Sequence, residues 1–194
     1  MQYYKFENGN RKLTRALGND WSEAVFVNKF IVAQPIFAVK IIRNDLGNAI
    51  MIGVDFDSAH YTSALHSVAW CIFTSGQNQY AKGVVYQGKP TQPMKVNQIV
   101  TVKVDLVNKA ISYEVDGVSS GPPRALGLSD EDMKKLRGVV QIHYKDESVE
   151  QVSELPYFPP RGFCMKFDKI LRSHKSMSIQ GRRQGFIYHP NPPQ

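Results

Sequence analysis

The sequence predicts an all-β protein: a two-sheet antiparallel β-sandwich with one short connector helix and an irregular basic C-terminal tail. Apolar and polar residues alternate with period two over residues 97–117, and similar short runs recur between Gly, Pro and Asn residues. A chain of 194 residues suits one filled core, because a single core grows to roughly 250 residues. We therefore expect a sandwich at residues 1–170 and a tail at residues 171–194.

The clearest element is an antiparallel hairpin at residues 97–117. Valine or leucine alternates with polar residues over positions 100–106, so one face of this strand meets a core. Asn108 lies in the connection, and residues 111–115 resume the alternation. An Asp-Gly pair at positions 116–117 then supplies the positive φ angles of a tight turn.

Further strands are expected wherever short apolar runs lie between turn residues. Two runs flank a turn that contains Asn and Gly, and we interpret them as a second hairpin. These runs are residues 37–41 and 49–56. The other expected strands are residues 70–73, 83–86, 139–144 and 162–167.

One helix is predicted at residues 129–138. Ser129 can accept a hydrogen bond from the amide of Asp132, acidic residues occupy the first turn, and basic residues occupy the last. Gly138 follows as a stop signal. At about two turns in length, this helix is a connector and not a layer of the core.

The order of these segments resembles the SPRY domain family. Residues 61–83 are similar to the family's segment in which a loop tyrosine precedes a buried tryptophan, here Tyr61 and Trp70. Residues 100–123 resemble its valine-rich hairpin, residues 136–144 its late strand, and residues 20–54 its opening strands.

The chain differs from the family pattern at two places. Cys71 stands where the family often has glycine, and Tyr113-Glu114-Val115 replaces a phenylalanine-rich strand. Other antiparallel sandwiches, such as the concanavalin-like lectins, are the alternative fold, because alternation alone does not separate them.

The resemblance implies recognition and not chemistry, since SPRY domains hold a partner peptide or protein with loops at one edge. The family's pocket tyrosine corresponds to Tyr61, which lies in a polar segment with His60 and Thr62, and its late-strand aromatic corresponds to Tyr144. The alternatives are an ordinary packed loop tyrosine for Tyr61 and a core tyrosine for Tyr144. A basic peptide-binding residue found in some members has no counterpart here.

The positive charge of the chain is concentrated at its C-terminal end. The net charge is +7, divided as +4 over residues 1–43, −3 over residues 44–160 and +6 over residues 161–194. We expect the tail to contact a partner, with basic side chains pairing with acidic groups or phosphates and aromatic side chains as anchors. The residues that carry this expectation are Arg182, Arg183, Phe186 and Tyr188. The alternative is that residues 186–188 fold back onto the body of the protein.

Signatures of catalysis, cofactor binding and metal binding are not found in the sequence. There is no G-x-S-x-G elbow, phosphate-binding glycine loop, H-E-x-x-H motif or paired cysteine cluster. Asp55 and Asp57 lack a third carboxylate at suitable spacing, so we interpret them as solvated strand-end acids. We predict no enzyme, no cofactor and no metal site. A triad of His143, Asp146 and some serine is the alternative left open.

The sequence thus predicts a non-catalytic protein-protein interaction module, a structural or adaptor subunit of a larger assembly. No apolar run is long enough for a membrane span, and Cys71 and Cys164 are expected to be free thiols, so we expect an intracellular, cytoplasmic protein. The alternative function is an RNA-contacting or other polyanion-contacting subunit of a ribonucleoprotein. A carbohydrate-binding or hydrolytic sandwich is a third possibility.

Overall fold

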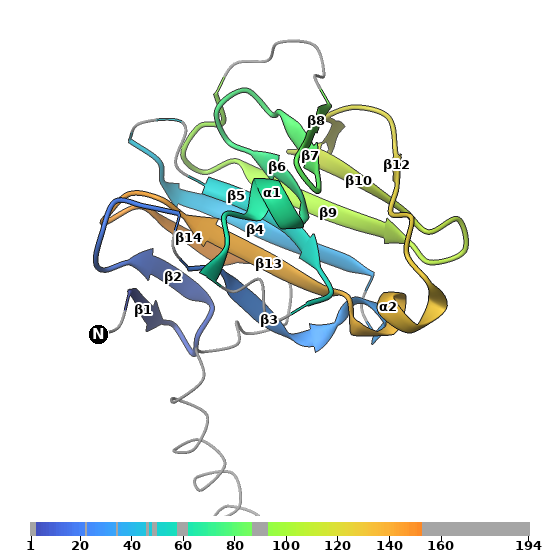
Figure 1. Ribbon diagram of the computed structural model, residues 1–194. Helices are drawn as coiled ribbons and strands as arrows, with labels where there is room; N and C mark the ends of the chain where they lie inside the picture. Colours follow the sequence, from blue (N-terminus) through green and yellow to red (C-terminus); the bar gives the residue numbers. More distant parts are fainter. Residues whose placement is uncertain are drawn as a thin grey trace, which may run out of the picture. The chain divides into compact units, whose positions relative to one another are not determined.

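The computed structural model describes residues 3–21, 23–33, 35–45, 47, 50–57, 62–86 and 93–152. Figure 1 shows its elements in chain order. They are β1 (Tyr4–Glu7), β2 (Lys12–Arg15), β3 (Val25–Phe30), the 3-10 helix η1 (Ile31–Ala33), β4 (Ile36–Arg43), β5 (Ile50–Asp55), α1 (Leu65–Val68), β6 (Trp70–Phe73), β7 (Gln79–Ala81), β8 (Val84–Tyr86), β9 (Ile99–Asp105), β10 (Ala110–Val115), β11 (Val118–Ser119), β12 (Arg124–Ala125), α2 (Asp130–Lys135), β13 (Arg137–Ile142) and β14 (Ser148–Gln151).

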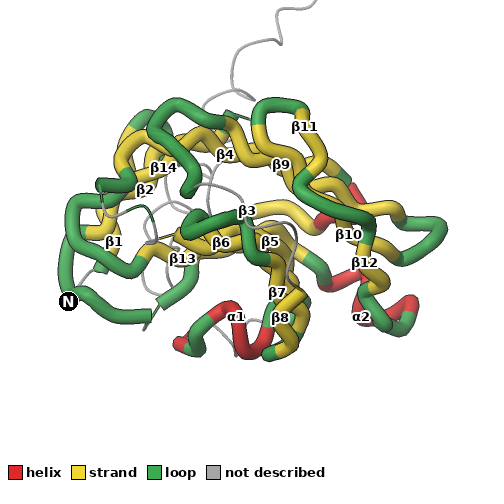
Figure 2. The backbone as a smooth tube through the Cα atoms, turned by 90° about the horizontal axis from the view of Figure 1, so that it is seen from above, coloured by secondary structure: helices red, strands yellow, loops and turns green. Residues whose placement is uncertain are grey.

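The strands form two antiparallel sheets that stack as the layers of a sandwich (Figure 2). Among the described residues, the first sheet has eight strands in the order β1-β2-β14-β4-β9-β10-β11, with β12 also pairing with β10. The second has six strands in the order β3-β13-β5-β6-β7-β8. The predicted antiparallel sandwich is confirmed. Neither described helix is long and apolar enough to cross a membrane.

The predicted hairpin at residues 97–117 is confirmed as β9 and β10. Val102 lies opposite Tyr113 in the register, and both side chains are buried. Asp116 and Gly117 have φ angles of 50° and 79°, which makes a type I′ turn between β10 and β11. Leu106 lies beyond the end of β9 and is 38% exposed, so the alternation stops one residue earlier than expected.

The main hydrophobic core lies between the two sheets. Alternate residues of β4, β9 and β10 contribute from one sheet, and alternate residues of β5, β6 and β13 from the other. Trp70 is 3% exposed within this core, as its position in an alternating strand predicts.

The expected hairpin between residues 37–41 and 49–56 is wrong. β4 pairs with β14 and β9 in the eight-stranded sheet, whereas β5 pairs with β13 and β6 in the six-stranded sheet. The chain therefore crosses from one layer to the other between these strands. Alternation specifies which face of a strand is buried and does not identify its hydrogen-bonding neighbour.

The predicted connector helix is confirmed as α2, with its cap. The Ser129 side chain accepts a hydrogen bond from the Asp132 amide at 3.1 Å. The helix ends at Lys135 because Leu136 is extended, and Gly138 belongs to β13 and does not terminate the helix. A second short helix, α1, was not predicted, and neither were β1 and β2 as separate strands. The strand expected at 162–167 lies outside the described residues.

The central strands β13, β5 and β6 of the six-stranded sheet are buried on both faces. The outer face of this sheet carries a second apolar cluster that includes Met51, Cys71 and Val139, and α1 lies over it (Figure 2). The outer face of the eight-stranded sheet is polar, as the ion pair of Lys103 with Glu114 at 2.5 Å illustrates. The two sheets thus offer different surfaces to a partner.

The close packing within and over this sheet constrains two residues of β5. A Cβ atom at Gly53 would overlap the Trp70 carbonyl oxygen and lie 2.6 Å from the Cys71 Cα, so only glycine fits there. Asp55 is fully buried, and its side chain accepts hydrogen bonds from the amides of Phe56 at 2.7 Å and Asp57 at 3.3 Å. The interpretation of Asp55 as a solvated acid is wrong, because the outer face that it occupies is covered.

Two buried tyrosines of the main core give a matched test of how hydroxyl groups are satisfied there. The Tyr4 hydroxyl donates to the Glu23 carbonyl at 2.7 Å and accepts from the Ile142 amide at 3.1 Å. The Tyr113 hydroxyl is buried without a hydrogen-bond partner in the described part of the chain. Burial raises the pKa of both, that of Tyr4 to about 12.

We expect Tyr4→Phe to lower the free energy of unfolding by about 1–3 kcal/mol, because it leaves two backbone groups unpaired. Tyr113→Phe removes only an unsatisfied hydroxyl and should leave that free energy unchanged or raise it by up to about 1 kcal/mol. Urea unfolding of the two variants measures the difference. A larger loss of unfolding free energy for Tyr113→Phe than for Tyr4→Phe would contradict the hydrogen-bonding roles given to the two hydroxyl groups.

Candidate partner-binding surface

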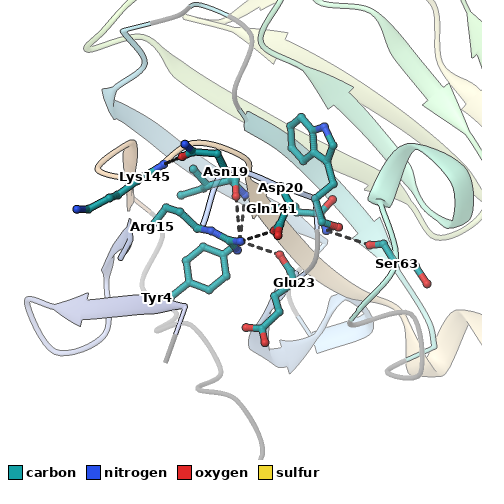
Figure 3. Close-up of polar contacts among 10 residues, drawn as sticks. Tyr4, Arg15, Asn19, Asp20, Glu23, Ser63, Gln141 and Lys145 are labelled. Carbon is teal, nitrogen blue, oxygen red and sulfur yellow. Dashed lines mark hydrogen bonds and ion pairs between the residues drawn. The ribbon is translucent and has the colours of Figure 1, made fainter. Parts of the chain in front are cut away.

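The buried carboxamide of Gln141 joins three parts of the chain on the outer face of the six-stranded sheet. Gln141 lies in β13 and is fully buried. Its Nε2 donates to the carbonyl oxygens of Ser63 at 2.9 Å and Trp21 at 3.0 Å (Figure 3), and its Oε1 accepts from the Leu65 amide at 2.9 Å. A single strand residue therefore positions both the start of α1 and the segment before β3.

A continuous row of half-buried rings runs from the loop after β13 across this face. Neighbouring ring centroids lie between 4.3 and 6.3 Å apart, within the range in which aromatic pairs attract. The rings come from the end of β13, the segment before β3, β6, β7 and α1. We call them the aromatic row: Tyr144, His143, Trp21, Phe73, Tyr80 and His66, in spatial order.

A buried cation supports the segment that carries Trp21. The Arg15 side chain is 0% exposed, and its Nη2 lies 2.6 Å from Asp20 Oδ1. The guanidinium carbon also lies 5.0 and 5.1 Å from the ring centroids of Tyr3 and Tyr4. An ion pair with the exposed Asp20 and two cation–π contacts stabilise this buried charge, and they hold the backbone immediately before Trp21.

The loop after β13 is tied to the same segment. The Lys145 amide donates to Asn19 Oδ1 at 3.0 Å, and the Asp146 amide donates to the Arg15 carbonyl at 2.8 Å. Tyr144 lies in this loop, because β13 ends at Ile142, two residues earlier than the predicted strand. Its ring is half-buried against the main core and also contacts His143 at 4.3 Å.

Two members of the predicted loop site, Thr62 and Tyr144, lie in the described residues. Thr62 is exposed and immediately precedes Ser63, whose carbonyl accepts a hydrogen bond from Gln141 of β13. Tyr144 follows β13, with its ring against the main core. We call the aromatic row together with Thr62 and Ser63 the candidate surface. His60 and Tyr61 lie outside the described residues, as do Cys164 and the tail residues Arg182, Arg183, Phe186 and Tyr188.

Sequence reasoning missed Gln141 and Trp21 as parts of the site. A usable signal was present, because Gln141 is the one polar residue within the apolar run Val139-Val140-Gln141-Ile142. His143 was considered only for a catalytic triad. It stacks between Trp21 and Tyr144, and no hydrogen bond joins it to Asp146 within the described ranges.

Cys71 lies beneath this face as a buried free thiol. Burial, together with the nearby Asp55, raises the pKa of the thiol above its usual value. A protonated, covered thiol is a poor nucleophile, so Cys71 acts as part of the outer apolar cluster.

Comparison with known proteins supports the fold. No protein-family model and no curated protein matches the chain. Among solved structures, a human SPRY domain is similar with a TM-score of 0.61 and 13% identity, covering 77% of this chain and 94% of that one. The SPRY domain of human HERC1 has a TM-score of 0.51 and 20% identity, covering 79% and 94%.

The PSpry domain of TRIM65 is a third similar structure, with a TM-score of 0.56 and 10% identity, covering 79% of this chain and 87% of that one. At these identities the likeness concerns the fold. The chain has a SPRY-type β-sandwich, and the fold that the sequence resemblance implied is confirmed.

Replacing Gln141 tests how the candidate surface is held. Gln141→Leu keeps the size of the side chain but leaves two carbonyls and one amide without partners. We expect the free energy of unfolding to fall by about 2–4 kcal/mol, since each buried unpaired group costs about 1–3 kcal/mol. Hydrogen exchange at the Leu65 amide should also accelerate relative to the amides of β9. Unchanged exchange at Leu65 would show that Gln141 does not hold this segment.

His143 should make stability depend on pH. Burial lowers its pKa below the usual value, the Asp20 charge raises it and the Arg15 charge lowers it. The unfolded chain therefore takes up a proton at a higher pH than the folded protein does, and the folded state loses stability as pH falls through about 6.5.

The variant His143→Phe keeps a ring in the row but cannot be protonated. When the pH is lowered from about 7.5 to about 5.5, we expect its free energy of unfolding to fall by less than that of the unmodified protein. Urea unfolding at both pH values gives the two differences. Equal losses in the two proteins would show that His143 is not responsible.

Proposed function

We propose that this protein is a non-catalytic protein-protein interaction module that binds its partner through the candidate surface. In this proposal it serves as a structural or adaptor subunit of a larger intracellular assembly. The observation that carries the proposal is the aromatic row, which lies beside the exposed Thr62 and is held in place by Gln141 and Arg15.

The physical character of the row suits protein recognition. Aromatic side chains supply a large contact area with few rotatable bonds, so ordering them costs little entropy. Here the rings also contact one another before any partner arrives, which lowers the cost of binding further. Half-buried rings with hydroxyl and imidazole edges favour a partner that presents apolar groups together with hydrogen-bonding groups.

The SPRY-type fold supports the same proposal, because the family that the sequence resembles recognises peptides and proteins with loops at one edge. Tyr61 and His60 precede Thr62 in the chain and would extend the candidate surface. The tail would add a second contact, with Arg182 and Arg183 toward acidic groups and Phe186 and Tyr188 as anchors.

A polyanion contact is the second candidate function, and one observation favours it. Residues 161–194 carry a net charge of +6, which is the kind of concentrated charge that binds nucleic acid without sequence specificity. Such binding would weaken steeply as salt is raised, whereas binding through an aromatic surface would not.

Affinity purification of the full chain from its native cells, followed by quantitative mass spectrometry, tests the proposal. Thr62→Arg places a large charged side chain on the candidate surface without disturbing the core, because Thr62 is exposed. Val107→Arg is the matched control, since Val107 is 89% exposed in the turn between β9 and β10 of the other sheet. We expect Thr62→Arg to lose a stoichiometric partner by about tenfold or more and Val107→Arg to retain it.

A chain ending at residue 172 separates the two contacts of the proposal. Loss of the partner on truncation alone would assign binding to the tail and not to the candidate surface. Recovery of nucleic acid that is lost in high salt would favour the polyanion function. If all variants capture the same proteins as the unmodified chain, neither site is correct.

A further inference from the structure

In the part of the chain that the structure describes, β8 forms an edge of the six-stranded sheet. Among the described residues β8 pairs only with β7, and it is the last strand of its sheet. Val84 is 54% exposed and Val85 is 48% exposed. Figure 1 shows β8 beside β7, with β12 of the other sheet nearby.

The backbone of Val85 is directed to the open side. Lys82 and Gly83 have φ angles of 46° and 85°, so a two-residue type I′ turn joins β7 to β8. The residues that flank such a turn, Ala81 and Val84, form a hydrogen-bonded pair. The next pair in the register is then not hydrogen-bonded across the ladder, which turns the amide and carbonyl of Val85 away from β7.

A cation lies at the end of this edge. The guanidinium carbon of Arg124, in β12, lies 4.4 Å from the centroid of the Tyr86 ring. Arg124 Nε is buried and has no hydrogen-bond partner among the described residues. Because side chains alternate along a strand, the side chains of Val84 and Tyr86 project from the same side of β8. Val85 lies on the opposite side, next to Tyr80.

The described segments next to this edge carry charge of one sign. Residues 74–86 and 118–128 contain Lys82 and Arg124 and no Asp or Glu. A second copy of the chain pairing β8 with β8 would bring these cations together, and the segment 161–194 with its charge of +6 would also be repelled. An anionic occupant is the one that this electrostatic arrangement favours.

We propose that the β8 edge binds an extended acidic peptide by strand addition. The amide and carbonyl of Val85 hydrogen-bond to the peptide backbone, and an apolar side chain of the peptide packs beside Val84. A carboxylate two residues along, on the same side of the added strand, pairs with the Arg124 guanidinium. This contact uses backbone groups that the candidate surface does not use, so it stands independently of the proposed function.

Fluorescence anisotropy with the full chain tests the proposal. The probe is a labelled ten-residue peptide of repeating Val-Thr-Glu-Thr sequence, which places valine and glutamate two residues apart on one side of an added strand. It is compared with a peptide in which lysine replaces glutamate. We expect the acidic peptide to bind at least about tenfold more tightly than the basic one. Arg124→Gln should weaken the acidic peptide about tenfold by removing the charge pair, and Val85→Pro should do the same by removing the outward amide.

Val107→Ser, at an exposed turn of the other sheet, is the control and should bind like the unmodified chain. Melting curves establish that each variant is folded; if Val85→Pro is not, Val85→Glu tests the same edge by charge repulsion. Equal binding of the two peptides, or unchanged binding by both edge variants, overturns the proposal. Self-association that Val85→Pro abolishes would also overturn it, because a second copy would then be the occupant.

Discussion

Burial of both faces of the central strands β13, β5 and β6 is the constraint on which the other features depend. A strand with two covered faces has no solvated side for a polar residue, so each polar group there must find a partner within the protein. Gln141 and Asp55 do so by hydrogen bonding to backbone groups. Gly53 reflects a separate constraint within the sheet, because the neighbouring strand β6 approaches its backbone too closely for any side chain.

The covering of the outer face also defines what a partner would meet. The aromatic row lies over the second apolar cluster, so its rings are partly structural and partly available for contact. Stability and recognition are therefore coupled at Trp21 and Phe73, because both rings pack against the second apolar cluster. Thr62 is exposed and packs on neither cluster, so a substitution there can change recognition without changing stability.

Local patterns in the sequence predicted local structure well. The alternation around Val102 and Tyr113, the Asp-Gly turn and the cap at Ser129 each depend on neighbouring residues, and each is confirmed. The predicted pairing of β4 with β5 is wrong, because two strands joined by a short turn can belong to different sheets. The role of Trp21 was missed for a similar reason: its contacts with Gln141 and His143 span about 120 residues of sequence and leave no local pattern.

The position of β14 has a consequence for how the protein forms during synthesis. β14 lies between β2 and β4, with Val149 opposite both Leu13 and Ile41. The hairpin of β1 and β2 is therefore made first by the ribosome and can join its sheet only after residue 151 has emerged. Pairings of such long sequence separation form slowly, and until they form, the edges of β2 and β4 stay open to wrong partners. The nascent chain should thus depend on chaperones until almost the whole sandwich has been translated.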